Sequence, residues 1–287
     1  MNEKLVPNAA PGKSSEETSA LERQERLFAC LRGLDSLLVA FSGGADSAYL
    51  AWAAHTVLGE RALAITALSA SFPKHDREQA ESFVRVVGLR HESIETREFE
   101  NPLYVANNAD RCYHCKDELF SQMESLARER GFCAIAYGIN ADDTQDFRPG
   151  HRAAREHRIL APLFDSGLKK QEIRELSRLA GLPTWDRPAS ACLSSRVPYG
   201  TAVTPELLEK IERAEAVLRL LGFRQFRVRA HGELARIELA PDELARGFEA
   251  EMARQISARL KELGFTFVTL DLEGYRQGSL NSLLKAK

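Results

Sequence analysis

The sequence lacks the long apolar run that a membrane-spanning helix requires. No stretch approaches about 18 consecutive apolar residues, and the opening residues, MNEKLVPNAAPGKSSEETS, have no apolar core of the kind found in signal peptides. A charge excess is also lacking: the formal net charge of −2 gives no overall attraction to nucleic acid. We therefore expect a cytoplasmic protein with no membrane partner, for which nucleic acid is not an expected partner, and a disordered tail over residues 1–17.

Cysteine is scarce and odd in number, which argues against a disulfide framework. The five cysteines are Cys30, Cys112, Cys115, Cys133 and Cys192. Cys30 and Cys133 lie in apolar helix and strand patterns, so we expect both to be buried in the core. Cys112 and Cys115 form a C-x₂-C unit, whose spacing suits two ligands of one metal or cluster. A redox pair or two incidental cysteines would have the same spacing.

A glycine loop follows the first strongly apolar segment. Residues 37–47 read LLVAFSGGADS, a pattern typical of a strand, a tight turn and a helix start. Glycines let the backbone approach an anion, the helix N-terminus attracts it, and the aspartate could hold Mg²⁺. On this geometry alone, a simple turn is equally compatible. The Walker A spacing and its lysine are absent, which argues against γ-phosphate transfer. The candidate nucleotide-binding residues here are Ser42, Gly43, Gly44, Asp46 and Ser47.

Strand and helix patterns alternate through the first half of the chain. Strands are predicted at 36–41, 62–68, 91–96 and 133–137, and helices at 20–32, 47–58, 75–87 and 116–130. This alternation predicts an α/β fold with a parallel sheet and helices on both faces. Ligands of such sheets bind at the carboxyl ends of the strands. Gly138 and Asp142 follow the 133–137 strand, so we expect them near the glycine loop, although Gly and Asp are also ordinary turn residues.

The later chain predicts a domain boundary and a second, smaller domain. Residues 161–187 indicate a helix with Ile173, Leu176 and Leu179 on one face, which ends a first domain of residues 18–187. A Ser/Pro/Gly-rich loop at 188–200 carries Cys192. Residues 201–287 predict a small α+β domain. Its expected helices are 205–221 and 242–263, and its expected strands are 225–230, 234–239 and 266–271.

Several polar residues of these later segments are candidates for chemistry. Arg196 lies about one helical turn from Cys192, where a cation would lower the pKa of the thiol, although a lone loop cysteine is more often inert. Arg227 and Arg229 share one face of a strand, either as a solvated edge or as a phosphate site. Glu215 and Glu238 are weaker candidates, and an exposed helical glutamate explains Glu215 equally well.

Four stretches together resemble one family. SGGADS at 42–47 is similar to the PP-loop of the ATP pyrophosphatases, and GINADDTQDFRPG, PASACLSSRVPYG and LDLEGYRQGSLN resemble the LarE family of sulfur transferases. That family makes the nickel-pincer nucleotide cofactor of lactate racemase. The resemblance implies ATP and Mg²⁺ as cofactors and a small-molecule nucleotide substrate, pyridinium-3,5-biscarboxylic acid mononucleotide. One carboxylate would be adenylated with release of pyrophosphate and then become a thiocarboxylic acid. A homo-oligomer, with a hexamer as one form, is also implied.

The resemblance also assigns roles to residues. It places Cys192 at the reacting centre, where Arg196 and Glu215 are the further catalytic candidates, and it places Ser195, Arg227 and Arg229 on the substrate phosphate. In sacrificial members of the family, a cysteine of the loop corresponding to 188–200 gives up its own sulfur. Those members are expected to lack the C-x₂-C pair. Cys112, Cys115 and Cys192 could instead hold a [4Fe–4S] cluster with one open iron for a hydrosulfide, which is the interpretation we favour.

Functions of other classes remain open at this point. A PP-loop tRNA thiolase would share the loop and a three-cysteine cluster, but should carry a basic RNA-binding face or an added RNA domain. A non-catalytic nucleotide sensor with a structural metal site would release no pyrophosphate. An amidotransferase would need a glutaminase domain or another ammonia source, and no segment is long enough to form such a domain.

Overall fold

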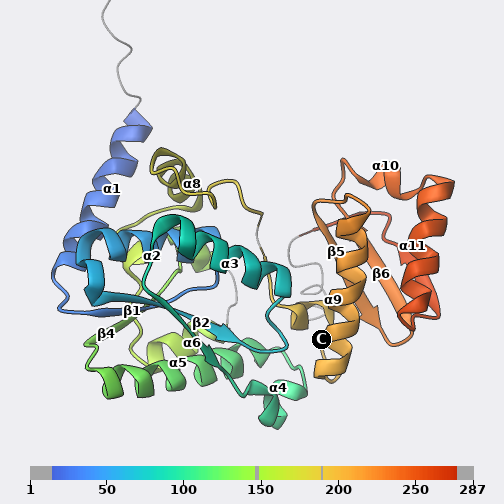
Figure 1. The fold of residues 1–287 in the computed structure, drawn as a ribbon, viewed down its shortest axis with the longest axis horizontal. Helices are drawn as coiled ribbons and strands as arrows, with labels where there is room; N and C mark the ends of the chain where they lie inside the picture. The colour runs from blue at the N-terminus through green and yellow to red at the C-terminus, as the bar shows by residue number, and fades with distance from the viewer. Residues whose placement is uncertain (1–14, 146–148, 189, 277–287) are drawn as a thin grey trace, which may run out of the picture.

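The computed structural model describes residues 15–145, 149–188 and 190–276, arranged around two β-sheets (Figure 1). The first sheet contains β1 (Leu37–Ala40), β2 (Ala62–Leu68), β3 (His91–Glu95) and β4 (Ala134–Tyr137). All its pairs are parallel, in the order β3-β2-β1-β4, with Leu37 opposite both Ala62 and Ala134. The predicted α/β class with a parallel sheet is confirmed. We call residues 15–188 the N-terminal lobe.

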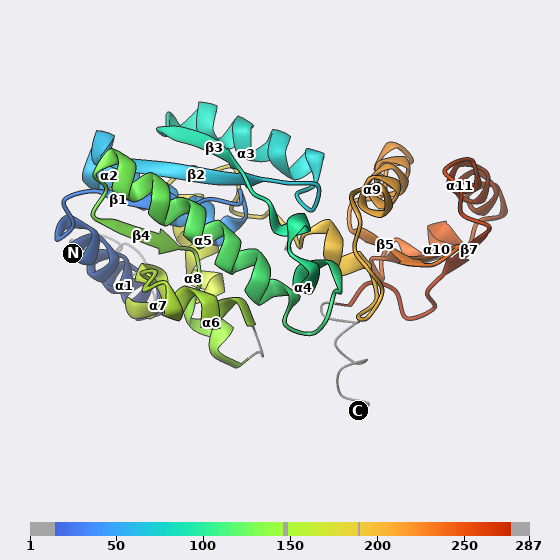
Figure 2. The same cartoon turned by 90° about the horizontal axis from the view of Figure 1, so that it is seen from below.

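Helices cover both faces of this sheet (Figures 1 and 2). One face packs against α1 (Ser15–Arg32), α2 (Ala45–Leu58), α3 (Lys74–Val87) and α8 (Lys170–Leu179), and the other against α5 (Arg111–Arg130) and α6 (Pro149–Glu156). Along β1, Leu37 and Val39 join the first core and Leu38 and Ala40 the second. Because successive side chains point to opposite faces, a strand buried on both sides must be apolar throughout. This is why the glycine loop follows an unbroken apolar run.

Short helical segments fill the connections. They are η1 (Gly59–Arg61), η2 (Glu98–Glu100), α4 (Pro102–Val105), η3 (Ala141–Gln145), α7 (Pro162–Asp165) and η4 (Leu193–Arg196). Of these, η4 directly follows Cys192 and precedes the elements of the second sheet along the chain.

The second sheet forms the core of a smaller lobe, residues 201–276. It comprises β5 (Phe226–His231), β6 (Leu234–Leu239) and β7 (Phe267–Leu270), with β5 antiparallel and β7 parallel to the central β6. Helices α9 (Pro205–Leu220) and α11 (Ala250–Glu262) pack on the same face (Figure 2), and α10 (Leu244–Gly247) precedes α11. The predicted small α+β region is confirmed, while the exact domain boundaries stay a prediction.

Four predicted elements differ most from the structure. Helix α1 begins at Ser15, inside the expected 1–17 tail, whose residues 1–14 lie outside the described part. The predicted 161–187 helix is two helices, α7 and α8, and the predicted 242–263 helix is α10 and α11. Helix α5 begins at Arg111 rather than 116, so the C-x₂-C pair lies inside its first turns instead of preceding it.

Two burial predictions were wrong, and one residue lies off the helix face predicted for it. Leu179 is 70% exposed, because each step of three residues falls short of a full helical turn and two such steps carry it off the face of Ile173. Cys30 and Cys133 are both exposed. Cys133 precedes β4, and its Sγ donates to the Ser36 carbonyl oxygen at 2.9 Å. An apolar sequence pattern near the end of a helix or strand therefore did not predict burial correctly for these two cysteines.

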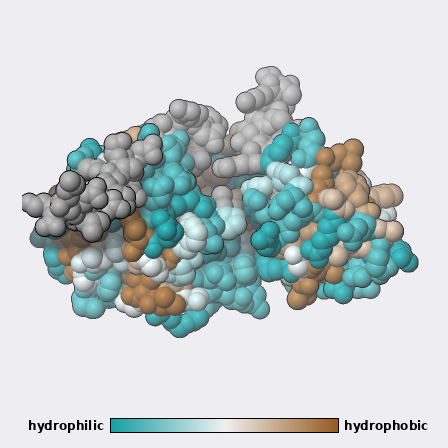
Figure 3. Space-filling view, turned by 90° about the horizontal axis from the view of Figure 1, so that it is seen from above, coloured by the Kyte–Doolittle hydropathy of each residue, from teal (hydrophilic) through white to brown (hydrophobic). Residues whose placement is uncertain are grey.

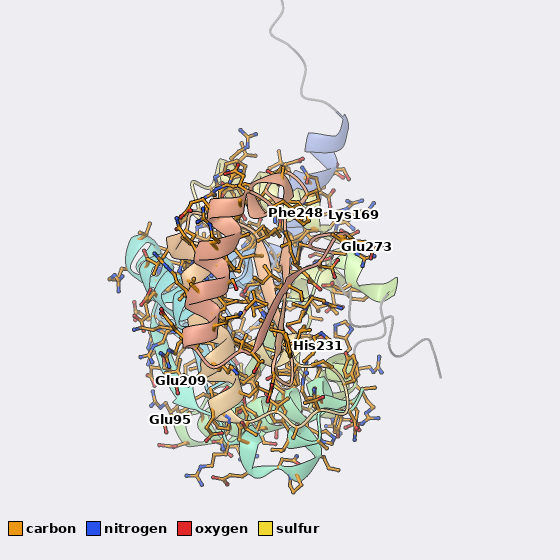
Figure 4. All side chains as sticks on the ribbon, turned by 90° about the vertical axis from the view of Figure 1, so that its right-hand side faces the viewer. Glu95, Lys169, Glu209, His231, Phe248 and Glu273 are labelled. Atoms are coloured by element: carbon orange, nitrogen blue, oxygen red, sulfur yellow. The ribbon has the colours of Figure 1, made fainter. Side chains whose placement is uncertain are left out.

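The surface shows no single dominant apolar face in the view of Figure 3, where hydrophobic residues form separate patches among hydrophilic ones. Phe248, which is 53% exposed, lies near the start of α11, and His231 lies at the opposite end of the C-terminal lobe (Figure 4). Of the described helices, none has both the length and the apolar character needed to cross a bilayer.

Candidate functional site

The glycine loop joins the end of β1 to the start of α2. Gly43 has a φ of 72°, and a Cβ there would lie 2.9 Å from the Cβ of Ala80 on α3, so only glycine fits. Ser47 Oγ accepts from the Ser42 N–H at 3.2 Å and donates to the Gly44 carbonyl oxygen at 3.1 Å. Gly44 caps α2 without a side-chain hydrogen bond. The first N–H groups of the helix therefore stay available to an anion.

Asp46 has one carboxylate oxygen engaged and one free among the described residues. Its Oδ2 accepts from Lys170 Nζ at 2.6 Å and from Asn140 Nδ2 at 3.3 Å. Its Oδ1 is buried, with no hydrogen-bond partner in the part of the chain that the structure describes. Mg²⁺ commonly binds carboxylate oxygens next to phosphate groups. Asp46 Oδ1, beside the candidate anion-binding loop, is therefore a suitable Mg²⁺ ligand. Lys170 was not predicted as a site residue, and no local motif marks it.

Gly138 and Asp142 lie at the predicted edge of the sheet but act on the loop indirectly. A Cβ on Gly138 would lie 2.7 Å from the backbone nitrogen of Ser47, so this glycine allows β4 to approach the start of α2. Asp142 Oδ2 accepts from the backbone N–H of Lys170 at 2.8 Å, which fixes the start of α8. A direct role for either in nucleotide binding stays a prediction. Asp146, Phe147 and Arg148 of the same motif lie outside the described residues.

The three candidate cysteines share one neighbourhood. Cys112 and Cys115 lie three residues apart on α5, and Cys192 caps η4. Burial, followed by the nearby Cys192, raises the pKa of the Cys115 thiol to about 12. Cys112 is exposed to solvent but closely surrounded by protein atoms. That crowding raises the pKa of its thiol, against the opposing effect of Arg111. The thiols thus interact with one another across two segments of the chain.

The three thiols are the donor set for the cluster that the sequence predicts, and that cluster stays a prediction. Among residues 15–145, 149–188 and 190–276, no three His, Cys, Asp or Glu side chains gather closely enough to hold one metal ion. A [4Fe–4S] cluster binds its cysteines through different irons, so their sulfurs stand further apart. Of the three thiols, Cys112 is exposed, and Cys115 and Cys192 are of intermediate exposure.

A set of buried polar residues that the sequence did not reveal holds the cysteine segment. Arg111, only 4% exposed, donates to the Ser194 carbonyl oxygen at 2.8 Å. The Tyr104 hydroxyl lies 2.7 Å from Ser194 Oγ. Burial opposes the charge of Arg111, but the thiols of Cys192 and Cys112 raise the pKa of its guanidinium. The one signal that could have identified Arg111 is its position directly before the C-x₂-C pair.

Arg196 and Glu215 form a buried, two-pronged ion pair. The Nε–Oε1 and Nη2–Oε2 distances are 2.9 and 3.0 Å, and the two side chains are 2% and 6% exposed. Glu215 Oε1 also accepts from the Val228 N–H at 3.1 Å. The interpretation of Glu215 as an exposed helical residue was therefore wrong. Arg196 Nη1 donates to the Cys192 carbonyl oxygen at 2.9 Å, so it orients the backbone that carries this cysteine.

The two predicted phosphate arginines have different surroundings. Arg229 is buried, and its Nη1 and Nη2 donate at 2.7 Å to the Ser195 carbonyl oxygen and to Glu238 Oε2. The interpretation of this pair as a solvated edge was therefore wrong for Arg229. Arg227 is half-buried, with its guanidinium 5.0 Å from the Tyr275 ring centroid. Burial and the nearby Arg196 lower the pKa of Arg227.

A cavity of about 350 Å³ lies between the two lobes. Its walls come from the start of α3, the 183–190 connection, α9 and β5. Five arginines and three carboxylates line it: Arg187, Arg196, Arg219, Arg224, Arg227, Asp76, Asp186 and Glu215. This excess of positive charge favours an anionic ligand. Of the predicted substrate-binding residues, Arg227 lines the cavity, whereas Ser195 and Arg229 do not.

Comparison with known proteins gives related chains along almost the whole length, although no protein-family model matches. The chain is 43% identical over 266 residues to an uncharacterized protein of Synechocystis sp., covering 93% of this chain and 98% of the relative. It is 34% identical over 264 residues to the pyridinium-3,5-bisthiocarboxylic acid mononucleotide synthase of Lactiplantibacillus plantarum, covering 91% and 95%. An uncharacterized protein of Methanocaldococcus jannaschii is 28% identical over 241 residues, covering 84% and 90%.

Proposed function

Because the chain belongs to the LarE family, we propose that it is an ATP-dependent sulfur transferase acting on pyridinium-3,5-biscarboxylic acid mononucleotide. It would adenylate one carboxylate, release pyrophosphate and convert the acyl-adenylate to a thiocarboxylic acid. The Lactiplantibacillus plantarum relative is a pyridinium-3,5-bisthiocarboxylic acid mononucleotide synthase, which supports this substrate class.

The observation that carries the proposal is that one arginine joins the glycine loop to the arginine-lined cavity. Arg187 Nη1 donates to the Gly43 carbonyl oxygen at 2.7 Å, and the same side chain lines the cavity. ATP on the loop and a mononucleotide in the cavity would therefore meet beside Arg187. This is the arrangement that transfer of an adenylyl group to a carboxylate requires.

The chain's own groups supply binding and orientation for the first step. The uncapped N–H groups of α2 would hold the phosphates of ATP. Asp46 would hold Mg²⁺ through its Oδ1, while Lys170 keeps the opposite oxygen in place. Mg²⁺ would supply charge neutralisation at the phosphates. Adenylation makes AMP the leaving group in place of an oxide, which is a poor one.

In the second step, a sulfur nucleophile attacks the acyl carbon, a C–S bond forms and the C–O bond to AMP breaks. If the sulfur comes from Cys192, a base must then take its Cα proton while the Cβ–Sγ bond breaks, so that the sulfur stays on the product and dehydroalanine remains in the chain. A [4Fe–4S] cluster held by Cys112, Cys115 and Cys192 would instead supply an open iron for a hydrosulfide. We favour the cluster because all three thiols lie in one neighbourhood.

Pyrophosphate exchange tests the adenylation step. Exchange of labelled pyrophosphate into ATP should require both the wild-type protein and the biscarboxylic mononucleotide. Asp46→Asn should lower the exchange rate by at least about 100-fold, because one of its two carboxylate oxygens becomes an amide nitrogen that cannot ligate Mg²⁺. Exchange that is absent, or that needs no mononucleotide, would contradict the proposal.

Metal content tests the sulfur source. Protein purified without oxygen should contain about four irons and four acid-labile sulfides per chain, and Cys112→Ala should lose them. Cys133→Ala, a variant of an exposed cysteine at the far end of β4, should keep them. An iron-free wild-type protein would indicate that Cys192 itself is the sulfur source. Each chain should then transfer sulfur only once.

A further inference from the structure

A chain of direct contacts joins the glycine loop to the segment that carries Cys192. Arg187 donates through Nη1 to the Gly43 carbonyl oxygen at 2.7 Å and through Nη2 to Asp76 Oδ1 at 2.9 Å. Ser190 Oγ donates to the other carboxylate oxygen, Asp76 Oδ2. The side chains of Arg187 and Asp76 are only 13% and 12% exposed, so water competes weakly for these bonds. Cys192 follows Ser190 by two residues.

The far end of this segment is also fixed. The Leu193 N–H donates to the Ser71 carbonyl oxygen at 2.8 Å, in the loop that follows β2. Cys192 thus lies between two attachments to the N-terminal lobe, one at Ser190 and one at Leu193. A shift of either attachment would move the cysteine.

The contact at Gly43 affects the orientation of the glycine loop, where a phosphate would bind. In a trans peptide, the carbonyl and the following N–H point in opposite directions. By holding the Gly43 carbonyl oxygen, Arg187 fixes the direction of the Gly44 N–H, and Gly44 is the N-cap of α2. A bound phosphate would use donors of this helix end. A bound phosphate would therefore favour the same orientation of the Gly43–Gly44 peptide that Arg187 maintains.

We propose that Arg187 and Asp76 are positioning residues that couple occupancy of the glycine loop to the position of the Cys192 segment. Phosphate binding favours one orientation of the Gly43–Gly44 peptide, and Arg187, Asp76 and Ser190 transmit that preference along the chain. By linkage, ordering of the cysteine segment must then favour nucleotide binding to the same extent. The cysteine segment would be ordered only when the carboxylate can be activated.

Hydrogen–deuterium exchange of residues 190–197 tests the coupling in the intact protein, with Mg²⁺ and α,β-methylene-ATP as the probe. The analogue should slow exchange of this segment in wild type by at least about fivefold. Ser190→Ala should still bind the analogue, because the Arg187–Gly43 contact remains, and any loss of affinity should not exceed the coupling factor that is removed. The slowing should nevertheless be lost in this variant. Arg187→Met should lose both affinity and slowing.

A matched control is the exposed Arg77–Glu81 pair on α3. Arg77→Met should keep both wild-type affinity and wild-type slowing. If Ser190 merely supported the local fold, Ser190→Ala would raise exchange equally with and without the analogue, which would overturn the inference. Equal slowing in Ser190→Ala and wild type would overturn it as well.

The inference rests on the proposed ATP site, and its failure can be told apart from failure of that site. Absence of analogue binding by wild type in calorimetry would overturn both. Binding without slowed exchange would overturn the coupling alone. Neither measurement needs the mononucleotide or a cluster, so a negative pyrophosphate-exchange assay would leave the result of this test unaffected.

Discussion

Two carboxylates of the candidate site use their oxygens differently. Both oxygens of Glu215 bind Arg196, and one of them also accepts from Val228. Asp46 keeps one buried oxygen with no partner among the described residues. A carboxylate whose acceptor sites are engaged must break those bonds before it can bind a proton or an ion. We therefore interpret Glu215 as the residue that holds Arg196 in place, and Asp46 as the ligand-binding carboxylate.

Replacing Glu215 should destabilise the protein strongly. Glu215→Ala would leave the buried guanidinium of Arg196 without its counter-ion, at a cost of about 3–5 kcal/mol in the free energy of unfolding. Urea unfolding followed by circular dichroism measures this change. Glu209→Ala, at an exposed position of the same helix, should change the free energy by less than about 0.5 kcal/mol. A loss under about 1 kcal/mol for Glu215→Ala would contradict our interpretation, because that is the size of an average substitution.

Gly138 should tolerate no side chain. In Gly138→Ala the added Cβ would lie 2.7 and 2.8 Å from the backbone N and Cα of Ser47, and backbone atoms cannot rotate away. We expect a loss of about 1–3 kcal/mol in stability together with weaker ATP binding, since the start of α2 must move. Urea unfolding and calorimetry measure the two effects. Gly33→Ala, whose Cβ would meet only the Cys30 carbonyl oxygen at 3.4 Å, should bind ATP normally.

At the scale of elements, His157 fastens α6 to α5. It follows α6 directly, and its ring nitrogens lie 2.9 Å from Asp117 and 3.1 Å from Glu124, both on α5. Burial alone would lower the pKa of His157, but the hydrogen bonds to the two carboxylates outweigh it and the pKa is raised. A raised pKa in the folded state means that protonation stabilises the fold.

The sign of this linkage predicts a pH dependence. The stabilisation by His157 is fully present below the pKa of an unfolded histidine and is lost as the pH rises through the higher pKa of the folded state. Both carboxylates are partly exposed, so solvent screening limits the effect to about 0.5–1 kcal/mol. The difference in unfolding free energy between wild type and His157→Gln, measured from pH 5 to 8, should shrink with rising pH. A constant or growing difference would contradict this assignment.

The elements themselves were largely predictable, because helix and strand periods are local properties of the chain. The strand predicted at 62–68 matches β2, and the SGGADS motif lies at the predicted tight turn between β1 and α2. The misplaced residues depend on distant neighbours. Leu179 follows a helical pattern yet faces solvent, and Arg187 reaches the loop across 144 positions of the sequence. No local spacing distinguishes such an arginine from a solvated one. The chain of contacts from the glycine loop to the Cys192 segment could therefore not be predicted.

At the scale of the whole molecule, one buried side chain links the N-terminal lobe to the chain that enters the C-terminal lobe. Asn107 Nδ2 lies 3.3, 2.8 and 3.0 Å from the carbonyl oxygens of Val197, Pro198 and Thr201, and its Oδ1 accepts from Arg111. Its φ of 54° is left-handed, a conformation in which asparagine is more easily accommodated than most residues. These contacts hold the segment after η4 against the N-terminal lobe.

Removing this link should loosen the connection between the lobes. Asn107→Ala leaves buried carbonyl groups without their side-chain donor, removes one acceptor of Arg111 and places alanine at a left-handed φ. We therefore expect a loss of at least about 2 kcal/mol in the free energy of unfolding. Because the contacts hold residues 197–201, limited proteolysis should cut there faster than in wild type, before either lobe is degraded. Asn108→Ala, at the exposed neighbouring position, should be cut at the wild-type rate. If the two variants were cleaved alike, the segment would be held by the packing of Val197 and Val203 in the C-terminal core rather than by Asn107.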